Sequence, residues 1–331
     1  MAARMGNKLK LLYIIDILKK HTDEEHPLNA TEICEFLENE GVSAERKAIY
    51  NDIDMLIYYG FDIIKTRTPR AGYFLASREF ELPEIYLLAD AVRSADFITP
   101  KKTRELLSKI DSFLSIYQAK KRERITYISP QYKCKNEAIY YNIDKISQAI
   151  ESGVKISVTY VTRTLNDAKK IVAVEKVIKI SPYATLWEND RYYLVGNNEK
   201  YDNLIHLRLD RIKDITITKE AARHFSEVSE FRDSFNVADY AAKTFNMYGG
   251  ERAEIELKCK KSRLEQIIDR FSDEISVFGL TEDTFSFTTN VILSDGLVSW
   301  LMQFGADIEV VKPAVLREKI AERIRQLSEI Y

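Results

Sequence analysis

The chain has 331 residues and a mass of 38.4 kDa, which predicts two or three domains rather than one. Apolar residues make up 45% of it, and the net charge is −2, so any nucleic-acid surface must be a local basic patch. Its cysteines, Cys34, Cys134 and Cys259, are far apart without CxxC spacing, which indicates reduced thiols in a cytoplasmic protein. No apolar run is long enough to cross a bilayer.

The N-terminal part begins with two predicted helices. Apolar residues at helical spacing predict the first from Lys8 to Lys20, and Asp16 within it argues against a signal peptide. Asn29, followed by Glu32, is a capping signature for a second helix that ends at Gly41. Its acidic face would be repelled by phosphate, so we expect it to point away from DNA: Glu32, Glu35, Glu38 and Glu40.

A third helix and a hairpin complete this part. We expect Ser43 to cap the helix and Gly60 to end it. Residues 61–76 read as two strands about a turn, with basic side chains near the tip. Three helices followed by a hairpin predict a winged helix-turn-helix domain over residues 1–77.

The third helix carries a family pattern. Residues 42–63 resemble the recognition helix of the DeoR-type winged helix family, whose pattern is close to RTIYRDIxxL followed by Gly. Ala48 and Asn51 stand where that family often has Thr and Arg, and the matching positions are Lys47, Ile49, Tyr50, Asp52, Ile53, Leu56 and Gly60. The resemblance implies a recognition helix in the major groove and a wing on the backbone or minor groove. The DNA-binding residues expected from it are Ser43, Arg46, Lys47, Tyr50, Asn51, Lys65, Arg67 and Arg70. The alternative is a winged helix used for protein contact.

Two helices at residues 82–97 and 101–117 predict a helical connector over residues 78–135. A basic run follows them: Lys120, Lys121, Arg122 and Arg124. We interpret this run as a solvated helix end or linker rather than a second nucleic-acid site.

Strands dominate the next part. A helix at residues 140–152 precedes strands at 154–161, 169–186, 191–197 and 204–212, which predicts a small, strongly bent sheet or barrel. In the last strand, alternation places Ile205, Leu207 and Leu209 on one face and His206, Arg208 and Asp210 on the other.

The order of these pieces resembles a WYL domain, an Sm-like or SH3-like β-barrel found in bacterial regulators. Tyr192, Tyr193 and Leu194 stand at the name-giving triad, with Tyr192 in place of Trp. Arg208, Asp210 and Arg211 match the RxDRI ending of that family. The resemblance implies a ligand-sensing domain over residues 136–224.

Basic and aromatic residues of this domain predict its ligand. Arginines pair with phosphates, and tyrosine or histidine rings stack on bases, so the set favours single-stranded nucleic acid or a nucleotide. The candidates are Tyr160, Arg163, Tyr183, Arg191, Tyr192, His206, Arg208 and Arg211. Structural alternatives stay open: one tyrosine of the 192–193 pair in the core, an Asp210–Arg211 ion pair, a structural His206, and a solvated Arg191.

The C-terminal part alternates strands and helices in the order βαββαβ, with a further helix at residues 313–327. This order predicts a ferredoxin-like domain over residues 251–331, after a linker at 225–250. In proteins that resemble this one, such a region, WCX-like, extends the WYL domain and helps it to dimerise. The fold class expected is therefore α+β multidomain.

No catalytic motif is present: GxSxG, HExxH and P-loop patterns are missing from the sequence, and His206 and His224 lack metal-ligand spacing. We expect no enzyme activity, cofactor or metal. The predicted function is a homodimeric, ligand-responsive DNA-binding transcriptional regulator, acting as a repressor. The alternative is an accessory protein of a defence system that binds RNA or single-stranded DNA without recognising an operator.

Overall fold

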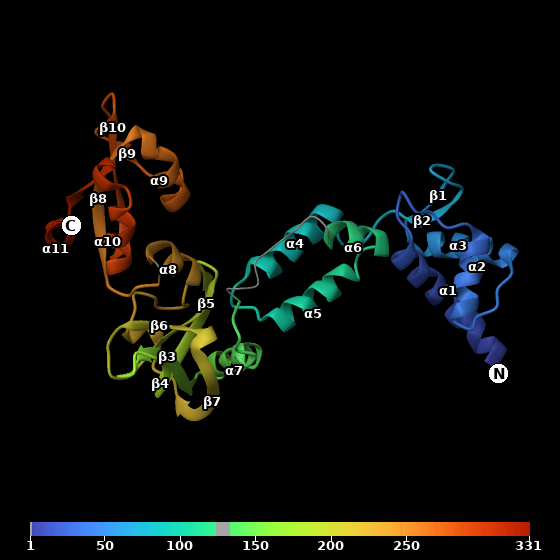
Figure 1. The fold of residues 1–331 in the computed structure, drawn as a ribbon, viewed down its shortest axis with the longest axis horizontal. Coiled ribbons are helices and arrows are strands. Elements are labelled where there is room, and N and C mark those ends of the chain that lie inside the picture. Colours follow the sequence, from blue (N-terminus) through green and yellow to red (C-terminus); the bar gives the residue numbers. More distant parts are fainter. Residues whose placement is uncertain (1, 124–132, 246) are drawn as a thin grey trace. The chain divides into compact units, whose positions relative to one another are not determined.

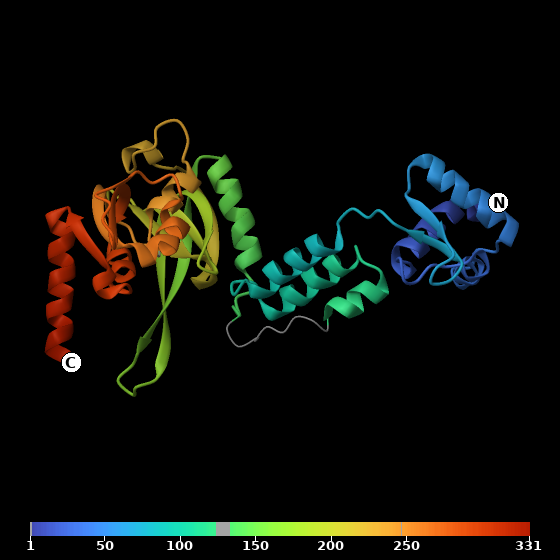
Figure 2. The same cartoon turned by 90° about the horizontal axis from the view of Figure 1, so that it is seen from above.

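A computed structural model describes residues 2–123, 133–245 and 247–331. The chain divides into two compact units, Met1–Cys134 and Lys135–Tyr331. Figure 1 shows the helices and strands of both units, and Figure 2 gives a second view of each.

The first unit begins with three helices and a hairpin, in the predicted order. These are α1 (Ala2–His21), α2 (Ala30–Asn39), α3 (Arg46–Tyr59), β1 (Ile63–Thr66) and β2 (Gly72–Leu75). The predicted cap of α2 is confirmed, since Asn29 Oδ1 accepts hydrogen bonds from the backbone of Thr31 and Glu32, and Glu32 accepts one from the Asn29 amide. This reciprocal capping box satisfies amide groups that have no partner within the helix.

The start of α3 was predicted wrongly. Glu45, not Ser43, precedes the helix, its side chain makes no capping hydrogen bond, and Ser43 lies exposed outside it. The sequence places a favourable cap residue here, but the chain becomes helical only at Arg46. The predicted end is confirmed, because Gly60 adopts φ 119°, a left-handed conformation that glycine reaches without strain.

Apolar side chains from the three helices form the core beneath α3. Fully buried members come from each helix: Ile14, Leu18, Ile33, Leu37, Ile49 and Ile53. Burying one such side chain stabilises the fold by about 1.5–3 kcal/mol relative to leaving it exposed. The core therefore fixes which face of α3 remains available to a partner.

The connector contains three helices where two were predicted. They are α4 (Leu82–Ser94), α5 (Pro100–Asp111) and α6 (Ile116–Glu123). The helix predicted to reach residue 117 is interrupted at Ser112–Ser115. Arg122 is buried and donates from Nε and Nη2 to Asp111 at 2.7 Å each, so this member of the basic run ties α6 to α5. Arg124 lies outside the described residues.

The second unit opens with α7 (Ile139–Glu151) and a five-stranded antiparallel sheet in the order β6-β5-β4-β3-β7. The strands are β3 (Val154–Leu165), β4 (Ile171–Glu188), β5 (Arg191–Asn197), β6 (Leu204–Arg208) and β7 (Ile212–Ala221). The β3–β4 hairpin extends beyond the rest of the sheet (Figure 2).

A short turn joins the two edge strands and bends this sheet. The edge strands β6 and β7 are linked only by the 3₁₀ helix Leu209–Arg211. Four peptide steps reach at most about 14 Å, whereas the edges of a flat five-stranded sheet lie about 19 Å apart. The sheet must therefore curl until its edges approach one another.

The strand predicted over residues 204–212 thus ends earlier, at Arg208, and Asp210 lies in the 3₁₀ helix. Side chains outside the strand hold this turn. Asn136 Nδ2 donates to the carbonyl of Ile212 at 2.7 Å and to that of Asp210 at 3.3 Å, while Asn142 donates to the carbonyl of Ile212 at 3.0 Å. The alternation of apolar and polar residues within residues 204–212 carries no information about hydrogen-bond donors that lie far away in the sequence.

The segment predicted as a linker is packed structure. It contains the 3₁₀ helix Phe225–Glu227 and helix α8 (Val237–Lys243), whose Tyr240 is buried. Phe231 and Phe235 pack against Tyr240, with ring centroids 6.5 and 5.5 Å away. These rings cover apolar residues of β4 and β5, including Ala184 and Val195. The aromatic content of the segment was the sequence signal of this packing.

The C-terminal part shows the predicted βαββαβ order. Its elements are β8 (Glu251–Lys260), α9 (Leu264–Phe271), β9 (Val277–Phe278), β10 (Thr284–Leu293), α10 (Asp295–Met302), β11 (Ile308–Lys312) and then α11 (Ala314–Ile330). The antiparallel sheet has the order β11-β8-β10-β9. Its core contains Ile255, Leu257 and Phe287. Across the described ranges of the whole chain, no helix is both long and apolar enough to cross a membrane.

Candidate functional site

Arg208 lies at the end of β6, directly opposite Tyr193 of β5 in the strand register. The Arg208 side chain donates from Nε to Asp210 Oδ1 at 3.0 Å and from Nη2 to Oδ2 at 2.7 Å. The hydrogen bonding of Arg208 to Asp210 is the main cause that raises the pKa of Arg208. The guanidinium side chain is 25% exposed, so the pair orients it without removing it from solvent.

Tyrosines from two strands lie in the electrostatic environment of this guanidinium. Tyr193 is half-buried, and burial raises its pKa, while the positive charges of Arg208, Arg191 and Arg211 act in the opposite direction. Tyr160 of β3, paired with Ile212 of β7, also affects the pKa of Arg208.

We call this group the arginine cluster: Tyr160, Arg191, Tyr193, Arg208, Asp210 and Arg211. Three guanidinium groups and one carboxylate act electrostatically on the Tyr193 hydroxyl, so the group carries a net positive charge beside two phenol rings. Such an arrangement can bind phosphate oxygens and stack a planar base.

Two predicted ligand-binding residues make contacts within the chain. His206 Nε2 lies 2.8 Å from Tyr240 Oη, with the rings stacked 5.6 Å apart, and burial lowers the pKa of His206 to about 4. Tyr183 donates its hydroxyl to the carbonyl of Arg223 at 2.9 Å, and burial raises its pKa to about 12. Both rings are covered by the segment after β7, so sharing a strand face with Arg208 does not leave His206 open.

Two further predicted residues lie on other faces of their strands. Tyr192 pairs with Trp187 across the β4–β5 hairpin, and its hydroxyl is 3.2 Å from Thr185 Oγ1. Alternation places it on the opposite face from Tyr193. Arg163 is exposed on the extended hairpin, on the opposite face of β3 from Tyr160.

Sequence reasoning therefore overlooked Tyr193 and the pairing role of Asp210. Tyr193 could have been found because it belongs to the predicted triad and alternates with Tyr192. The ion pair formed by Asp210 is with Arg208, not with Arg211. The register between β5 and β6, which puts Tyr193 opposite Arg208, has no signal in the local sequence.

The predicted DNA-binding residues lie on α3 and the hairpin, apart from Ser43, which lies in the loop before α3. Arg46, Lys47 and Asn51 are exposed on α3, and Arg46 Nε donates to Tyr50 Oη at 3.0 Å. Lys65 of β1 extends its ammonium to within 5.9 Å of the Tyr50 ring centroid, a cation–π distance that links the helix to the hairpin.

The two arginines near the tip of the β1–β2 hairpin differ in their contacts. Arg67 is exposed, but Arg70 donates to Glu32 of α2 at 2.7 Å. Glu32 therefore lies beside the basic tip. That the acidic face of α2 points away from DNA stays a prediction. Because both side chains remain partly exposed, phosphate can compete for Arg70.

An ion pair beneath α3 fixes its orientation. Lys10 Nζ of α1 lies 2.8 Å from Asp52 Oδ2, and both side chains are 12% exposed. This pair holds the buried face of α3 against α1, while Lys47 and Asn51 face outward. Among the side chains that the structure describes, no cluster of histidine, cysteine and carboxylate groups suits a metal ion.

Comparison with known proteins gives two domain matches. Residues 141–217 match the family model of the WYL domain, and residues 251–328 match that of the WCX domain. The first range contains the arginine cluster, and the second covers nearly all of the C-terminal sheet and its helices.

Similar proteins include the "Uncharacterized HTH-type transcriptional regulator YobV" of Bacillus subtilis (strain 168). It is 22% identical over 319 residues, which cover 92% of this chain and 94% of that protein. The similarity therefore extends beyond the two matched domains.

Two solved structures are also similar. Proteasome accessory factor B/C (PafBC) of Arthrobacter aurescens is 13% identical, with a TM-score of 0.28 over 94% of this chain, which spans only 47% of that protein. A CRISPR Cas-related protein is 15% identical, with a TM-score of 0.36 over 100% of this chain and 86% of its own. At these TM-scores neither structure defines the fold.

Proposed function

Since the chain carries a WYL domain followed by a WCX domain, we propose that it is a DNA-binding transcriptional regulator whose WYL domain senses a nucleic-acid fragment or nucleotide. The near full-length similarity to a protein described as an HTH-type transcriptional regulator supports the DNA-binding part. The arginine cluster is the single observation that carries the sensing part.

The chemistry of the cluster favours an anionic ligand with a planar ring. Asp210 neutralises one guanidinium and orients it, while Arg191 and Arg211 add further positive charge near Tyr193. Phosphate oxygens replace water on guanidinium groups, and a base can stack on a half-buried phenol ring. A ligand with only one of these features would use half of the site.

Fluorescence anisotropy with a short labelled single strand tests this proposal. Arg208→Ala should weaken binding about tenfold, equivalent to about 1.4 kcal/mol, and should reduce the salt slope of binding by about 0.7 for a lost phosphate contact. Lys219→Ala is the matched control, because it removes one exposed positive charge from β7 outside the cluster. If Arg208→Ala and Lys219→Ala weakened binding equally, the loss of affinity would come from the lower net charge of the protein, and this result would contradict a defined site.

The second part of the proposal places operator DNA on α3 and the hairpin of a homodimer that assembles through the WCX domain. Half-sites would then be related by a two-fold axis, with a spacing of about one or more helical turns. Lys47→Ala should weaken binding at the protein's own promoter while α3 stays folded, because Lys47 is exposed and the core lies on the other face. An unchanged footprint would mean that another surface contacts DNA.

Sensing becomes regulation, here repression, only if the ligand binds one dimer geometry better than the other. Promoter affinity measured with and without the single strand tests this coupling. The alternative of a defence accessory protein predicts single-strand binding without promoter-specific duplex binding. The positive charge of the β1–β2 hairpin does not distinguish the regulator from the defence accessory protein, because Lys65 and Arg70 already have contacts within the chain.

A further inference from the structure

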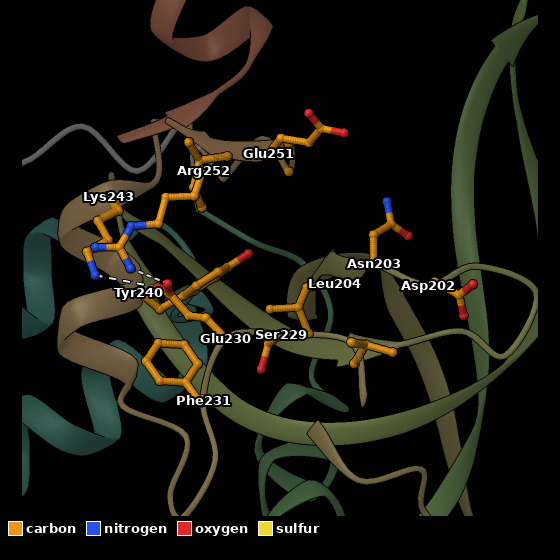
Figure 3. Close-up of a pocket in the computed structure, with 14 residues that line it drawn as sticks. Asp202, Asn203, Leu204, Ser229, Glu230, Phe231, Tyr240, Lys243, Glu251 and Arg252 are labelled. Carbon is orange, nitrogen blue, oxygen red and sulfur yellow. Dashed lines mark hydrogen bonds and ion pairs between the residues drawn. The ribbon is translucent and has the colours of Figure 1, made fainter. Parts of the chain in front are cut away.

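A cavity of about 440 Å³ lies where three parts of the second unit meet (Figure 3). They are the five-stranded sheet (the WYL sheet), residues 225–245 with helix α8 (the α8 segment) and the four-stranded C-terminal sheet (the WCX sheet). Its walls come from the start of β6, from residues 228–231, from α8 and from the first residues of β8. None of the arginine-cluster residues lines it. It is therefore a second site within the same unit, separate from the proposed sensing site.

The floor of the cavity is aromatic and apolar. Tyr240 is buried and Phe231 half-buried, and Leu204 and Ile292 add aliphatic surface. The Tyr240 hydroxyl is already engaged with His206, so the ring presents carbon to the cavity rather than a free polar group. A ligand would place a hydrocarbon or ring portion here.

Glycine at position 249 keeps one wall open. A Cβ added to Gly249 would lie 3.4 Å from the Leu204 carbonyl oxygen, which is ordinary contact, so a larger side chain would extend into the cavity without backbone strain. This position provides a way to fill the cavity while leaving the charged residues intact.

The charges around the cavity decide which ligand fits. Both cations of the lining already have partners, since Lys243 and Arg252 converge on Glu230 (Figure 3). Lys243 also pairs with Asp239 at 2.5 Å. The remaining lining charges, Asp202 and Glu251, are both carboxylates.

Neighbouring charges do not reverse this balance. Asp202 pairs with Arg223 at 2.9 Å, but Arg223 also binds Glu227. Glu251 is exposed on the cavity rim, and Asn203 adds an amide group there. An anion would therefore meet a net negative environment, whereas a cation would find carboxylates at the rim of a cavity that has an aromatic floor.

We propose that this cavity binds a small organic cation, an amine carried on an apolar stem. The amine lies at the rim of the cavity, where Asp202 and Glu251 supply carboxylates, and the stem lies over Tyr240 and Phe231. Such a ligand contacts the WYL sheet, the α8 segment and the WCX strand β8 at once, and would stabilise their packing against one another by binding only the folded arrangement.

Isothermal titration calorimetry of the full chain with spermidine tests the proposal, with 1,8-octanediol as an uncharged probe of similar length. We expect one saturable site for spermidine and none for the diol. Glu251→Gln should weaken spermidine binding about fivefold, which corresponds to about 1 kcal/mol. Glu254→Gln removes an exposed carboxylate from the same strand outside the cavity and should leave binding unchanged.

Gly249→Leu distinguishes the cavity from the general acidic surface. It should abolish the spermidine site while Trp300 fluorescence and thermal unfolding show a folded chain. Absence of saturable spermidine binding up to about 10 mM, or equal binding by Gly249→Leu, would overturn the proposal. Binding of AMP that is lost in Arg252→Ala would also overturn it, because the cavity would then accept anions.

Discussion

His206 should make the stability of the second unit depend on pH. Its ring is packed against Tyr240, and burial lowers its pKa from 6.5 to about 4. Between these values the unfolded chain binds a proton that the folded chain does not, so the free energy of unfolding falls as the pH falls below about 6.5. The loss ends near pH 4, where the folded form is protonated as well.

The size of this loss follows from the pKa difference. A difference of about 2.5 units corresponds to about 3 kcal/mol in total, of which about 2 kcal/mol is lost by pH 5. This is a large fraction of the stability of an ordinary domain. The packing of α8 against β6, through Tyr240 and His206, should therefore loosen on acidification.

Urea denaturation at a series of pH values from about 7.5 to 5 measures this effect. Both tryptophans of the sequence, Trp187 and Trp300, lie in the second unit, so their fluorescence reports its unfolding. His206→Phe keeps an aromatic ring beside Tyr240 and should remove about 2 kcal/mol of pH dependence. His224→Gln, an exposed control in the same unit, should not. An unchanged pH slope in His206→Phe would refute the reasoning.

Two further substitutions test local structure. Asn29→Ala should destabilise the first unit by about 1 kcal/mol, because it removes the cap of α2. Faster amide hydrogen exchange in α2 would report this loss. Unchanged exchange would show that the cap contributes nothing to stability. Gly250→Ala should destabilise the second unit by about 2 kcal/mol, since its Cβ would lie 2.0 Å from the Leu293 carbonyl oxygen. Gly249→Ala, whose Cβ has room, is its control in the same denaturation assay, and equal unfolding midpoints would contradict the predicted clash.

The predicted elements succeeded where the signal is local. The capping box of α2 and the glycine end of α3 depend on residues within a few positions of one another, so sequence spacing contains the geometry. The βαββαβ order likewise follows from hydrophobic periodicity within each element. The Ser43 cap failed because a suitable residue type does not determine where the chain turns helical.

The candidate site was predicted in part for the same reason. The RxDRI ending and the triad at residues 192–194 point to the region that holds Arg208, Asp210 and Tyr193. Their register across β5 and β6, and the ion pair in the 3₁₀ turn, depend on strand pairing and on asparagines about 70 residues earlier in the chain. Single-sequence reasoning has no access to such contacts.

Sequence by itself determined the helices, most strands and the residue types available for binding anions, because periodicity, caps and charge are properties of neighbouring residues. Tertiary structure decided which of those residues are open. The α8 segment covers His206 and Tyr183 but leaves Arg208, two residues further along β6 than His206, partly exposed. Burial is a property of packing between distant segments, and so strand alternation alone could not separate His206 from Arg208.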